Sequence, residues 1–527
     1  MLLNRLVDAA ALRAPKAPAA RCDGETLSYE QLSCRANGLA RVLLATGLDR
    51  RDRVGVLLRK GLDVPVGFHG VLAAGGTLVP IDPRSPVDAV ADILRATGAT
   101  HVVSEPGKQE TLRKALRDCP EVGHVIGLEP AEEEPFRCHP WARVSEAETD
   151  QPPDVEVTDT DPSYILHTSG STGRPKLIQH THRSAMSFVD WAAGEYSLTS
   201  ADRLSNHSSH HTCFATFDYY AAARAGAATV ILTPAVQMMP GSLSSLLEKE
   251  RVSVWYSVPT ALVQLSLRGD LESRDLGAMR WILFAGESFP EKHLRRLMQQ
   301  LPAARFSHVY GSTEVNVCTY YHLPQSGELQ WPLPIGRPCS NSSTEFVDED
   351  LRPVPEGDVG ELRVRGSTVM SGYWGEAERN RSVFVRPAAA GAAGDLYFRT
   401  GDRARVLPDG NLAFVTRSDL QVKVRGHRVE LEEIENALLS LDAVQEAAAF
   451  TVPDGEGSSA IQSVVVVDSG GWPGRQDVLA ELKKMLPSYC VPESVTCLAF
   501  LPRTPTGKVD RRALLDQLQK QEVFGDD

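Results

Sequence analysis

Hydrophobic and polar positions along the first 325 residues alternate between helical and strand-like spacing. Residues 28–48 carry apolar side chains at helical spacing behind Ser28, a residue type that caps helix N-termini. Short apolar runs of strand length recur with helical segments between them; they occupy residues 53–58, 101–105, 228–233, 252–258 and 280–287. This alternation predicts an α/β fold, with crossover helices joining the strands of parallel or mixed β-sheets.

The pattern changes in the C-terminal part of the chain. Residues 335–415 contain short strand-like runs between Gly and Pro turns, which predicts a small β-rich unit inside a large N-terminal domain. An amphipathic segment at 429–441 and a helical segment at 477–486 then flank two apolar runs, which indicates a small α+β domain. We expect a core over 1–415, a connection at 416–419 and a C-terminal domain over 420–527. The Pro- and acid-rich region 128–160 is expected to be a surface loop.

Length and composition narrow the class of protein. A chain of 527 residues exceeds one ordinary hydrophobic core, and its 42% hydrophobic and 23% charged content is typical of a globular protein. The net charge of −13 disfavours general nucleic-acid binding. The nine cysteines form no C-x-x-C pair, and the sequence contains neither a secretory signal nor an apolar run that would span a membrane. We therefore expect a cytoplasmic protein.

Residues 167–176, HTSGSTGRPK, are the first candidate for chemistry. Glycines let the backbone approach a ligand, and hydroxyl and backbone N–H groups can surround phosphate oxygens, with Arg174 and Lys176 adding positive charge. The spacing does not match the Walker phosphate-binding loop. A flexible polar linker is the alternative interpretation of this segment alone.

Four further segments favour phosphate binding over a flexible linker. They are VYGSTE at 309–314, YFRTGDR at 397–403, TRSDLQVKVRGHRVELEEIE at 416–435 and PRTPTGKVD at 502–510. Together with HTSGSTGRPK and in this order, they resemble the adenylate-forming superfamily of acyl-CoA synthetases, nonribosomal peptide adenylation domains and luciferases. The resemblance implies an ATP-dependent ligase that joins a carboxylic acid to AMP and releases pyrophosphate. It then transfers the acyl group to a nucleophile. ATP and Mg²⁺ are the implied cofactors.

The resemblance also assigns roles to matching residues. The phosphate loop would comprise Thr168, Ser169, Gly170, Ser171, Thr172, Gly173 and Lys176. Tyr310 would stack on adenine, with Gly286, Glu287, Ser288, Gly311 and Ser312 beside it. Asp402 and Arg417 would bind the ribose. The implied catalytic residues are Thr313 on the α-phosphate, Glu314 on Mg²⁺, His207 at the mouth of the acid pocket, Lys176, and Lys508 between carboxylate and phosphate.

In such enzymes the small domain rotates between the two half-reactions. The hinge would be Asp419, and the face presented to the acceptor would carry Lys423 and Gly426. Thr416 stands where glycine is usual, and we expect it to be tolerated because the position needs no positive φ.

The acid pocket is expected between residues 206–226 and the strands that follow. Counting back from Gly226, Cys213 occupies the place where amino-acid-activating members carry an Asp for the substrate ammonium; Asp218, five residues on, matches a different position. The remaining lining would be His207, Phe214, Phe217, Tyr256, Leu283, Ala285, Val309, Val317 and Cys318. Because a buried ammonium without a counter-ion is costly, this apolar lining disfavours ordinary α-amino acids and predicts a compact ring substrate such as an aryl acid. Tyr256, Leu283, Ala285, Val317 and Cys318 also resemble the lining of stand-alone prolyl-carrier ligases, which implies a cyclic, proline-like acid as the other candidate.

Two alternatives concern the same region. His207, His210 and His211 would have metal-ligand spacing on a helix, but the segment has the character of a loop followed by a strand, which disfavours zinc. A non-enzymatic nucleotide-binding scaffold is disfavoured because Lys508, Glu314, Lys176 and Asp402 are all retained.

The acceptor is left open by the sequence. No phosphopantetheine attachment site follows the C-terminal domain, so we expect transfer to a separate carrier protein in antibiotic or other secondary metabolism. CoA, or a free amine as in the aminocoumarin acyl ligases, remains an alternative acceptor.

Overall fold

The computed structural model describes residues 2–130, 136–168, 175–387, 395–417, 421–454, 459–467, 474–502 and 509–522. The chain separates into two compact units, which are described one at a time. Unit 1 comprises Met1–Pro83, Val90–His167 and Lys176–Ser418, and unit 2 comprises Arg84–Ala89, Thr168–Pro175 and Asp419–Asp527. The main division between the two units falls after Ser418.

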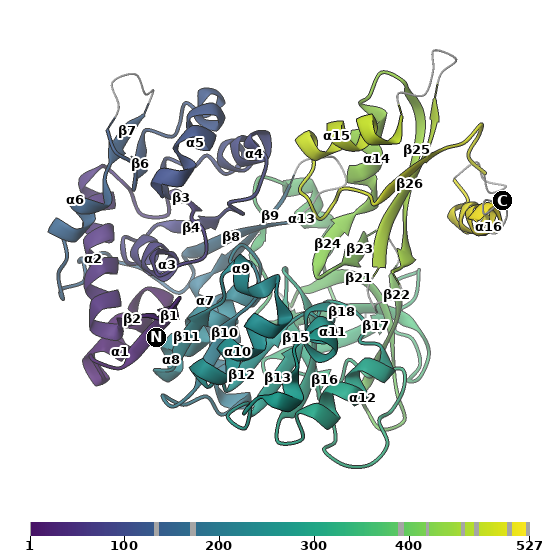
Figure 1. The fold of residues 1–527 in the computed structure, drawn as a ribbon, viewed down its shortest axis with the longest axis horizontal. Helices are drawn as coiled ribbons and strands as arrows, with labels where there is room; N and C mark the ends of the chain where they lie inside the picture. Colours follow the sequence, from purple (N-terminus) through teal and green to yellow (C-terminus); the bar gives the residue numbers. More distant parts are fainter. Residues whose placement is uncertain are drawn as a thin grey trace. The chain divides into compact units, whose positions relative to one another are not determined.

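A nine-stranded sheet forms one layer of unit 1 (Figure 1). Its strands run in the order β16 (Arg337–Pro338), β15 (Asn316–His322), β14 (Arg305–Ser312), β13 (Trp281–Phe284), β12 (Val254–Ser257), β10 (Arg203–Asn206), β11 (Ala228–Ile231), β1 (Pro18–Cys22) and β2 (Glu25–Ser28). The strands from β14 to β1 pair in parallel, whereas β15, β16 and β2 pair antiparallel at the two ends. The sheet is therefore mixed, as predicted.

An eight-stranded sheet and a smaller five-stranded sheet complete the β-structure of unit 1. The eight-stranded sheet has the order β19 (Gly372–Tyr373), β9 (Lys176–Thr181), β8 (Pro162–Thr168), β4 (Thr77–Pro80), β3 (Arg53–Leu57), β5 (His101–Ser104), β6 (His124–Ile126) and β7 (Arg137–His139). The five-stranded sheet contains β17 (Ser342–Val347), β18 (Gly360–Gly366), β21 (Tyr397–Val406) and β20 (Phe384–Val385), with β22 (Leu412–Arg417) paired to β21. It is the β-rich unit expected at 335–415.

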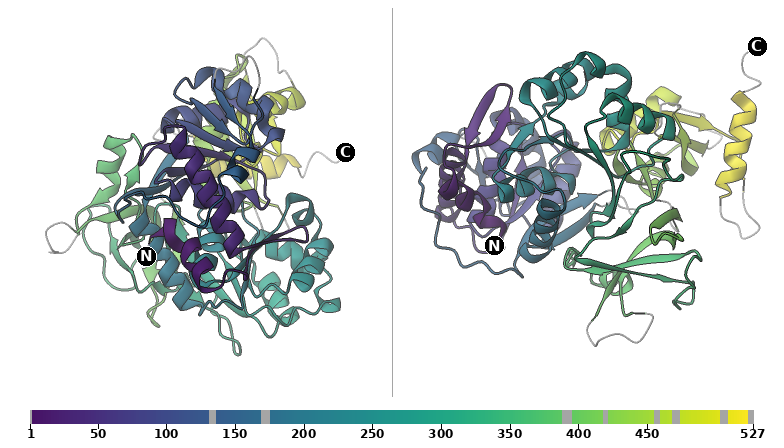
Figure 2. Two further views of the ribbon diagram at one scale, coloured as in Figure 1. Left: turned by 90° about the vertical axis from the view of Figure 1, so that its left-hand side faces the viewer. Right: turned by 90° about the horizontal axis from the view of Figure 1, so that it is seen from below.

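Helices connect the parallel strands and supply most of the remaining core. They are α1 (Leu6–Arg13), α2 (Tyr29–Ala45), α3 (Asp63–Ala73), α4 (Val87–Thr97), α5 (Gln109–Ala115), α6 (Trp141–Glu146), α7 (His182–Glu195), α8 (Ala222–Ala225), α9 (Pro234–Gln237), α10 (Pro240–Glu250), α11 (Pro259–Arg268), α12 (Glu291–Gln300) and α13 (Ala377–Val383). Ser28 caps α2, as the sequence predicted, and the structure adds a reciprocal capping box with Gln31. The α1 helix packs against α2 and α8, near the N-terminus marked in Figure 2.

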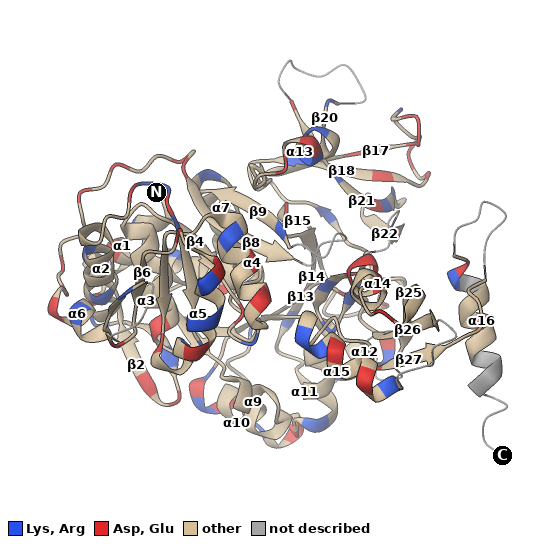
Figure 3. Cartoon of the chain, turned by 90° about the horizontal axis from the view of Figure 1, so that it is seen from above, with Lys and Arg blue, Asp and Glu red and all other residues tan. Residues whose placement is uncertain are grey.

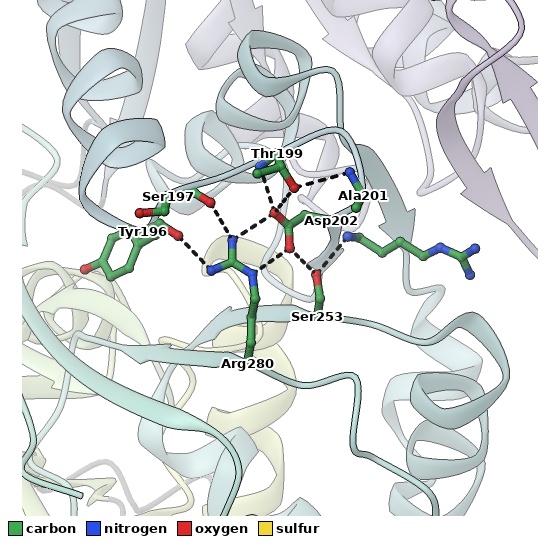
Figure 4. Close-up of polar contacts among 8 residues, drawn as sticks. Tyr196, Ser197, Thr199, Ala201, Asp202, Ser253 and Arg280 are labelled. Atoms are coloured by element: carbon green, nitrogen blue, oxygen red, sulfur yellow. Dashed lines mark hydrogen bonds and ion pairs between the residues drawn. The ribbon is translucent and has the colours of Figure 1, made fainter.

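A half-buried ion pair fixes the amino ends of three central strands (Figure 4). Asp202, Ser253 and Arg280 directly precede β10, β12 and β13. The Arg280 guanidinium donates to both Asp202 carboxylate oxygens at 2.7 and 2.8 Å, and the Ser253 hydroxyl donates to the same group at 2.8 Å. Burial alone would raise the pKa of Asp202, but these bonds outweigh it and lower the pKa. The amino ends are thus locked, and the loops at the carboxyl ends are available for other tasks.

Unit 2 is a small α+β fold. It contains a hairpin of β23 (Gln421–Val424) and β24 (His427–Glu430), a sheet of β25 (Val444–Pro453), β26 (Ser459–Val467) and β27 (Ser494–Cys497), and helices α14 (Leu431–Leu439), α15 (Arg475–Met485) and α16 (Arg511–Glu522). Ile434, Val465 and Leu482 lie in its hydrophobic core. The predicted helices at 429–441 and 477–486 are confirmed.

Two local predictions are wrong. Residues 128–160 are not only a surface loop, because β7 and α6 lie within them and the Trp141 indole donates to the Ser104 carbonyl at 3.0 Å. The segment of His207, His210 and His211 is not a loop followed by a strand: it comes after β10, and a π-helical turn over Thr216–Ala221 then leads into α8. Alanine has the highest helix propensity, and Gly226 ends this alanine-rich helix in a left-handed conformation at φ 73°.

The surface charges of unit 1 are mixed along individual helices (Figure 3). On α5, Glu110 pairs with Arg113 and Lys114, and on α12, Glu291 pairs with Arg295. Within the described ranges, no helix combines the length and apolar character needed to cross a lipid bilayer.

Candidate active site

The carboxyl ends of the parallel strands bring several predicted site residues to one edge of the nine-stranded sheet. His207 follows β10, Gly286 to Ser288 follow β13, and Gly311 to Glu314 lie at and beyond the end of β14. In open α/β sheets, ligands bind in the crevice outside these carboxyl ends. The strand order therefore places the predicted nucleotide and acid residues where such folds bind ligands.

Tyr310, Asp402 and Arg417 form a connected polar group. The Tyr310 hydroxyl and the Arg417 guanidinium both donate to the Asp402 carboxylate, one to each oxygen. The three residues come from β14, β21 and β22, so the group joins the nine-stranded and five-stranded sheets. Burial, together with the Asp402 charge, raises the pKa of Tyr310 far above its usual value, which keeps the phenol protonated. These are the residues predicted for adenine and ribose.

The hairpin between β14 and β15 holds Thr313 and Glu314. Glu314 is fully buried, and the Tyr373 hydroxyl donates to its carboxylate at 2.7 Å. The His180 imidazole donates to the Thr313 carbonyl at 2.8 Å, and burial lowers the pKa of His180 to about 4, so the ring is neutral near pH 7. Tyr373 and His180 belong to β19 and β9, which ties this hairpin to the eight-stranded sheet. Sequence reasoning missed both residues, because neither lies in a motif with a chemical signature.

Gly311 is required by close packing in this hairpin. A β-carbon at position 311 would lie 1.7 Å from the Asn316 carbonyl oxygen, a separation that no side chain can occupy. The register shifts between Tyr310 and Gly311, so the hairpin bulges where Ser312 begins the turn. The spacing of Tyr310 and Thr313 thus depends on a glycine between them.

The remaining predicted nucleotide residues of unit 1 come from two sheets, with Gly286 and Glu287 after β13 and Lys176 in the eight-stranded sheet. Gly286 has φ 100°, a conformation that favours glycine, and the Thr260 hydroxyl donates to the Glu287 carboxylate at 2.6 Å. Lys176 is the first residue of β9 and is buried. Thr416 lies in β22 without a positive φ, as expected for a tolerated replacement of glycine.

Most of the predicted acid-pocket residues belong to one hydrophobic cluster. The Phe214 and Tyr256 rings lie 4.5 Å apart, and Phe217 meets Tyr256 edge-on at 5.4 Å. Cys213 packs against the same cluster, whose other members include Leu283, Ala285, Val309 and Val317. Cys318 lies instead in the neighbouring cluster beneath Tyr310, and its thiol contacts the Tyr310 carbonyl at 3.6 Å. The structure therefore gathers an aromatic wall next to Cys213.

The three nearby histidines have separate neighbours. The His207 ring packs on Trp255 with centroids 5.2 Å apart, His210 meets Phe68 edge-on, and His211 stacks on His167. No group of metal-ligating side chains suited to an ion occurs among the residues that the structure describes. Burial and the Lys60 charge lower the pKa of His207 to about 3, so its ring is neutral near pH 7.

Asp218 belongs to the π-helical turn and is fully buried. The Asn206 side-chain amide donates to its carboxylate at 2.9 Å. Burial raises the pKa of Asp218 far above its usual value, more than Asn206 and the charge of Lys60 lower it. A carboxyl group in this environment favours its neutral form.

Several predicted residues are either outside the described residues or in unit 2. Ser169, Gly170, Ser171, Thr172, Gly173, Asp419 and Lys508 are outside the described residues, and Thr168 is the last residue of β8. In unit 2, Lys423 lies on β23 and Gly426 in the two-residue turn to β24, where Arg425 and Gly426 both have positive φ.

Comparisons with known proteins agree with this geometry. The model of the AMP-binding enzyme family matches residues 7–374, and that of the AMP-binding enzyme C-terminal domain matches residues 433–508. The chain is 33% identical to an L-proline--[L-prolyl-carrier protein] ligase of Pseudomonas fluorescens, over 96% of this chain and 97% of that protein. It is also 31% identical to bacitracin synthase 3 of Bacillus licheniformis, over 97% of this chain but only 8% of that protein.

Among solved structures, the amide bond synthetase McbA from Marinactinospora thermotolerans has the same fold. The TM-score is 0.86 at 24% identity, covering 98% of this chain and 99% of that one. That fold has a large N-terminal domain and a small C-terminal domain, as predicted here. The chain belongs to the AMP-binding enzyme family and is an AMP-forming acid ligase that uses ATP to activate a carboxylic acid.

Proposed function

We propose that this enzyme adenylates an aryl acid or a cyclic, proline-like acid and passes the acyl group to the phosphopantetheine thiol of a separate carrier protein. The observation that carries the proposal is the wall of Phe214, Tyr256 and Phe217 beside Cys213. The relative from Pseudomonas fluorescens is named as a ligase of L-proline and an L-prolyl-carrier protein, which supports the same class of acid and acceptor.

The physical argument for the acid has two parts. A planar or ring-shaped body gains roughly 25 cal/mol for each Å² of apolar surface that it buries. An α-ammonium group in the same place needs a counter-ion, and Cys213 supplies none. Asp218 is a poor substitute because its carboxyl group is buried on Asn206 and favours the neutral form. Both parts favour an aryl acid over an acyclic polar amino acid, and the first part alone favours a proline-like ring.

The nucleotide would use the residues of unit 1 in the roles that the sequence predicted. Asp402 is an acceptor-only group suited to two ribose hydroxyls, and Arg417 and Tyr310 already bond to it. Mg²⁺ is commonly held by one or two carboxylates together with substrate phosphates, and the buried Glu314, oriented by Tyr373, fits that role. Gly286, Glu287, Ser288, Gly311, Ser312, Thr313 and Lys176 complete the proposed site.

The proposal keeps three predicted parts that lie outside the described residues. The loop of Ser169, Gly170, Ser171, Thr172 and Gly173 would cover the phosphates, and Lys508 would bridge carboxylate and phosphate. Asp419 would be the hinge about which the 420–527 domain turns relative to the 1–415 core, presenting Lys423 and Gly426 to the acceptor.

Pyrophosphate exchange over proteinogenic amino acids, cyclic acids, benzoates and cinnamates tests the acid. We expect a ring acid to give the highest specificity constant. With an aryl acid, Cys213→Asp should lower that constant at least about tenfold, because it buries an unpaired carboxylate against the ring; a proline-like acid should instead gain a counter-ion for its ring ammonium. Cys213→Ser, which is similar in size and uncharged, is the matched control and should change it much less. A highest constant for serine, glutamate or lysine would overturn the proposed pocket.

The acceptor is tested separately with the preferred acid. Transfer of labelled acyl group to a carrier protein bearing phosphopantetheine is expected to exceed transfer to CoA or to free amines. The missing carboxylate at position 213 also suits an aryl-acid amide synthetase, and dominant transfer to a free amine would favour that second function.

A further inference from the structure

Lys60 holds the first peptide group beyond β10. It lies in the bend between β3 and α3, and its ammonium donates to the Asn206 carbonyl at 2.8 Å and to the His207 carbonyl at 2.7 Å. The Gln237 side-chain amide, at the end of α9, donates to the same His207 carbonyl at 2.7 Å. A carbonyl oxygen has two lone pairs, and Lys60 and Gln237 use both of those on the His207 carbonyl. No motif or predicted role involves Lys60.

A second set of bonds fixes the residue before His207. The Asn206 amide nitrogen donates to Asp218 at 2.9 Å, and its oxygen accepts from the Tyr219 hydroxyl at 3.2 Å. All three residues are buried, and Asp218 and Tyr219 belong to the π-helical turn that also carries Phe217. The network therefore connects the peptide of His207 to the turn that supplies the aromatic wall.

The His207 side chain has little freedom left. Its ring lies on Trp255 of β12, with centroids 5.2 Å apart and planes inclined by 38°. With the carbonyl held by Lys60 and Gln237 and the ring held by Trp255, both ends of the residue are constrained.

We propose that Lys60 is a positioning residue for adenylation, which fixes His207 at the mouth of the acid pocket. The inference rests on the proposed function, because the acid pocket of that function is the one at whose mouth the sequence predicts His207. Lys60 acts through the His207 peptide and does not itself contact the reacting atoms. Displacing a positioned group by about 1 Å can cost on the order of 100-fold in rate.

Lys60→Met keeps much of the side-chain length and removes the ammonium. We expect kcat of pyrophosphate exchange to fall about 10- to 100-fold while KM for ATP stays within about twofold. Lys60→Arg, which can still donate to both carbonyls, should recover most of kcat. In the Lys60→Met/His207→Ala double variant, the loss should be no larger than in His207→Ala alone, because both changes remove the same positioned group.

Arg53 provides a matched control. Its guanidinium also donates to two successive carbonyls, those of Thr97 at 2.8 Å and Gly98 at 2.6 Å, but it lies at the amino end of β3. Arg53→Met should therefore keep kcat within about twofold when both variants are compared at temperatures where they are fully folded. Thermal unfolding of each variant sets those temperatures.

A measurement without substrate separates this inference from the proposed function. The imidazole NMR signal of His207, assigned by its loss in His207→Ala, should shift or broaden in Lys60→Met and stay unchanged in Arg53→Met. An unchanged signal, an unchanged kcat or independent, multiplying losses in the double variant would overturn the role of Lys60. The wild-type enzyme could fail to exchange any ring acid while the His207 signal is still displaced in Lys60→Met. That result would contradict the proposed acid and leave Lys60 as the residue that positions His207.

Discussion

At the scale of single residues, Asp402 joins two other residues of the proposed nucleotide site, Tyr310 and Arg417. Its carboxylate receives both the Tyr310 hydroxyl and the Arg417 guanidinium, and its side chain is only 8% exposed. Removing one partner of a buried charge pair leaves the other charge uncompensated. Replacing Asp402 therefore affects both the stability of the fold and the proposed binding of the nucleotide.

Asp402→Asn should raise KM for ATP about 10- to 100-fold, since a hydrogen bond to a charged group is worth about 1.5–3 kcal/mol. It should also lower the free energy of unfolding by about 2–3 kcal/mol because Arg417 loses its counter-ion. Asp395→Asn is the control: it breaks the ion pair with Arg365 in the same unit, where the side chains are 31% and 40% exposed. That change should stay within about 1 kcal/mol. Equal effects of the two substitutions in urea unfolding and ATP kinetics would contradict this account of Asp402.

At the scale of elements, the hairpin of β14 and β15 sets the positions of Thr313 and Glu314. Gly311→Ala puts a β-carbon 1.7 Å from the Asn316 carbonyl, so the two strands must separate. Overpacking of this kind costs about 3 kcal/mol or more, and pyrophosphate exchange should fall with it. Gly194 is a matched control near the end of α7, where a β-carbon meets nothing within 4 Å. Gly194→Ala should stabilise the protein by up to about 1 kcal/mol. Activity of Gly311→Ala at the wild-type level would show that the hairpin does not need its close packing.

The elements also show what the sequence could predict. Helix α2 and strands β3, β5, β11, β12 and β13 were all predicted from periodicity and apolar runs, because α2 buries one apolar stripe and the strands are buried on both faces. The histidine segment was expected to be a loop followed by a strand, but a π-helical turn over Thr216–Ala221 follows it. The helix there is decided by the alanines and Gly226 that come next. The motifs identified Tyr310, Asp402 and Arg417 individually. The bonds that Lys60, His180 and Tyr373 make depend on strands far apart in sequence, and periodicity carries no information about them.

At the scale of the whole molecule, burial of neutral histidines makes stability depend on pH. Burial is the main cause in every case: it lowers the pKa to about 3 for His69 and His207 and to about 4 for His101, His167, His180 and His182. In the unfolded chain these groups have pKa values near 6.5. As pH falls below about 6.5, the unfolded state binds protons that the folded state cannot, so stability is lost. Asp218 acts in the opposite sense, because its raised pKa favours the protonated folded state at lower pH.

As pH falls, the six histidines lower the free energy of unfolding by more than the single carboxyl group of Asp218 raises it. One histidine that stays neutral in the fold costs about 1.4 kcal/mol of stability at one pH unit below its unfolded pKa. Between pH 7.5 and 5.5 we therefore expect the free energy of unfolding to fall by several kcal/mol, with a lower urea midpoint and melting temperature. His69→Gln should reduce this pH dependence by about one proton, because His69 is buried edge-on against Tyr220 and takes up its proton only on unfolding. Replacing His322, which is 27% exposed and bonded to Glu195, is the control and should leave most of the dependence in place. Stability that is constant or rises between pH 7.5 and 5.5 would mean that these rings are protonated in the folded protein.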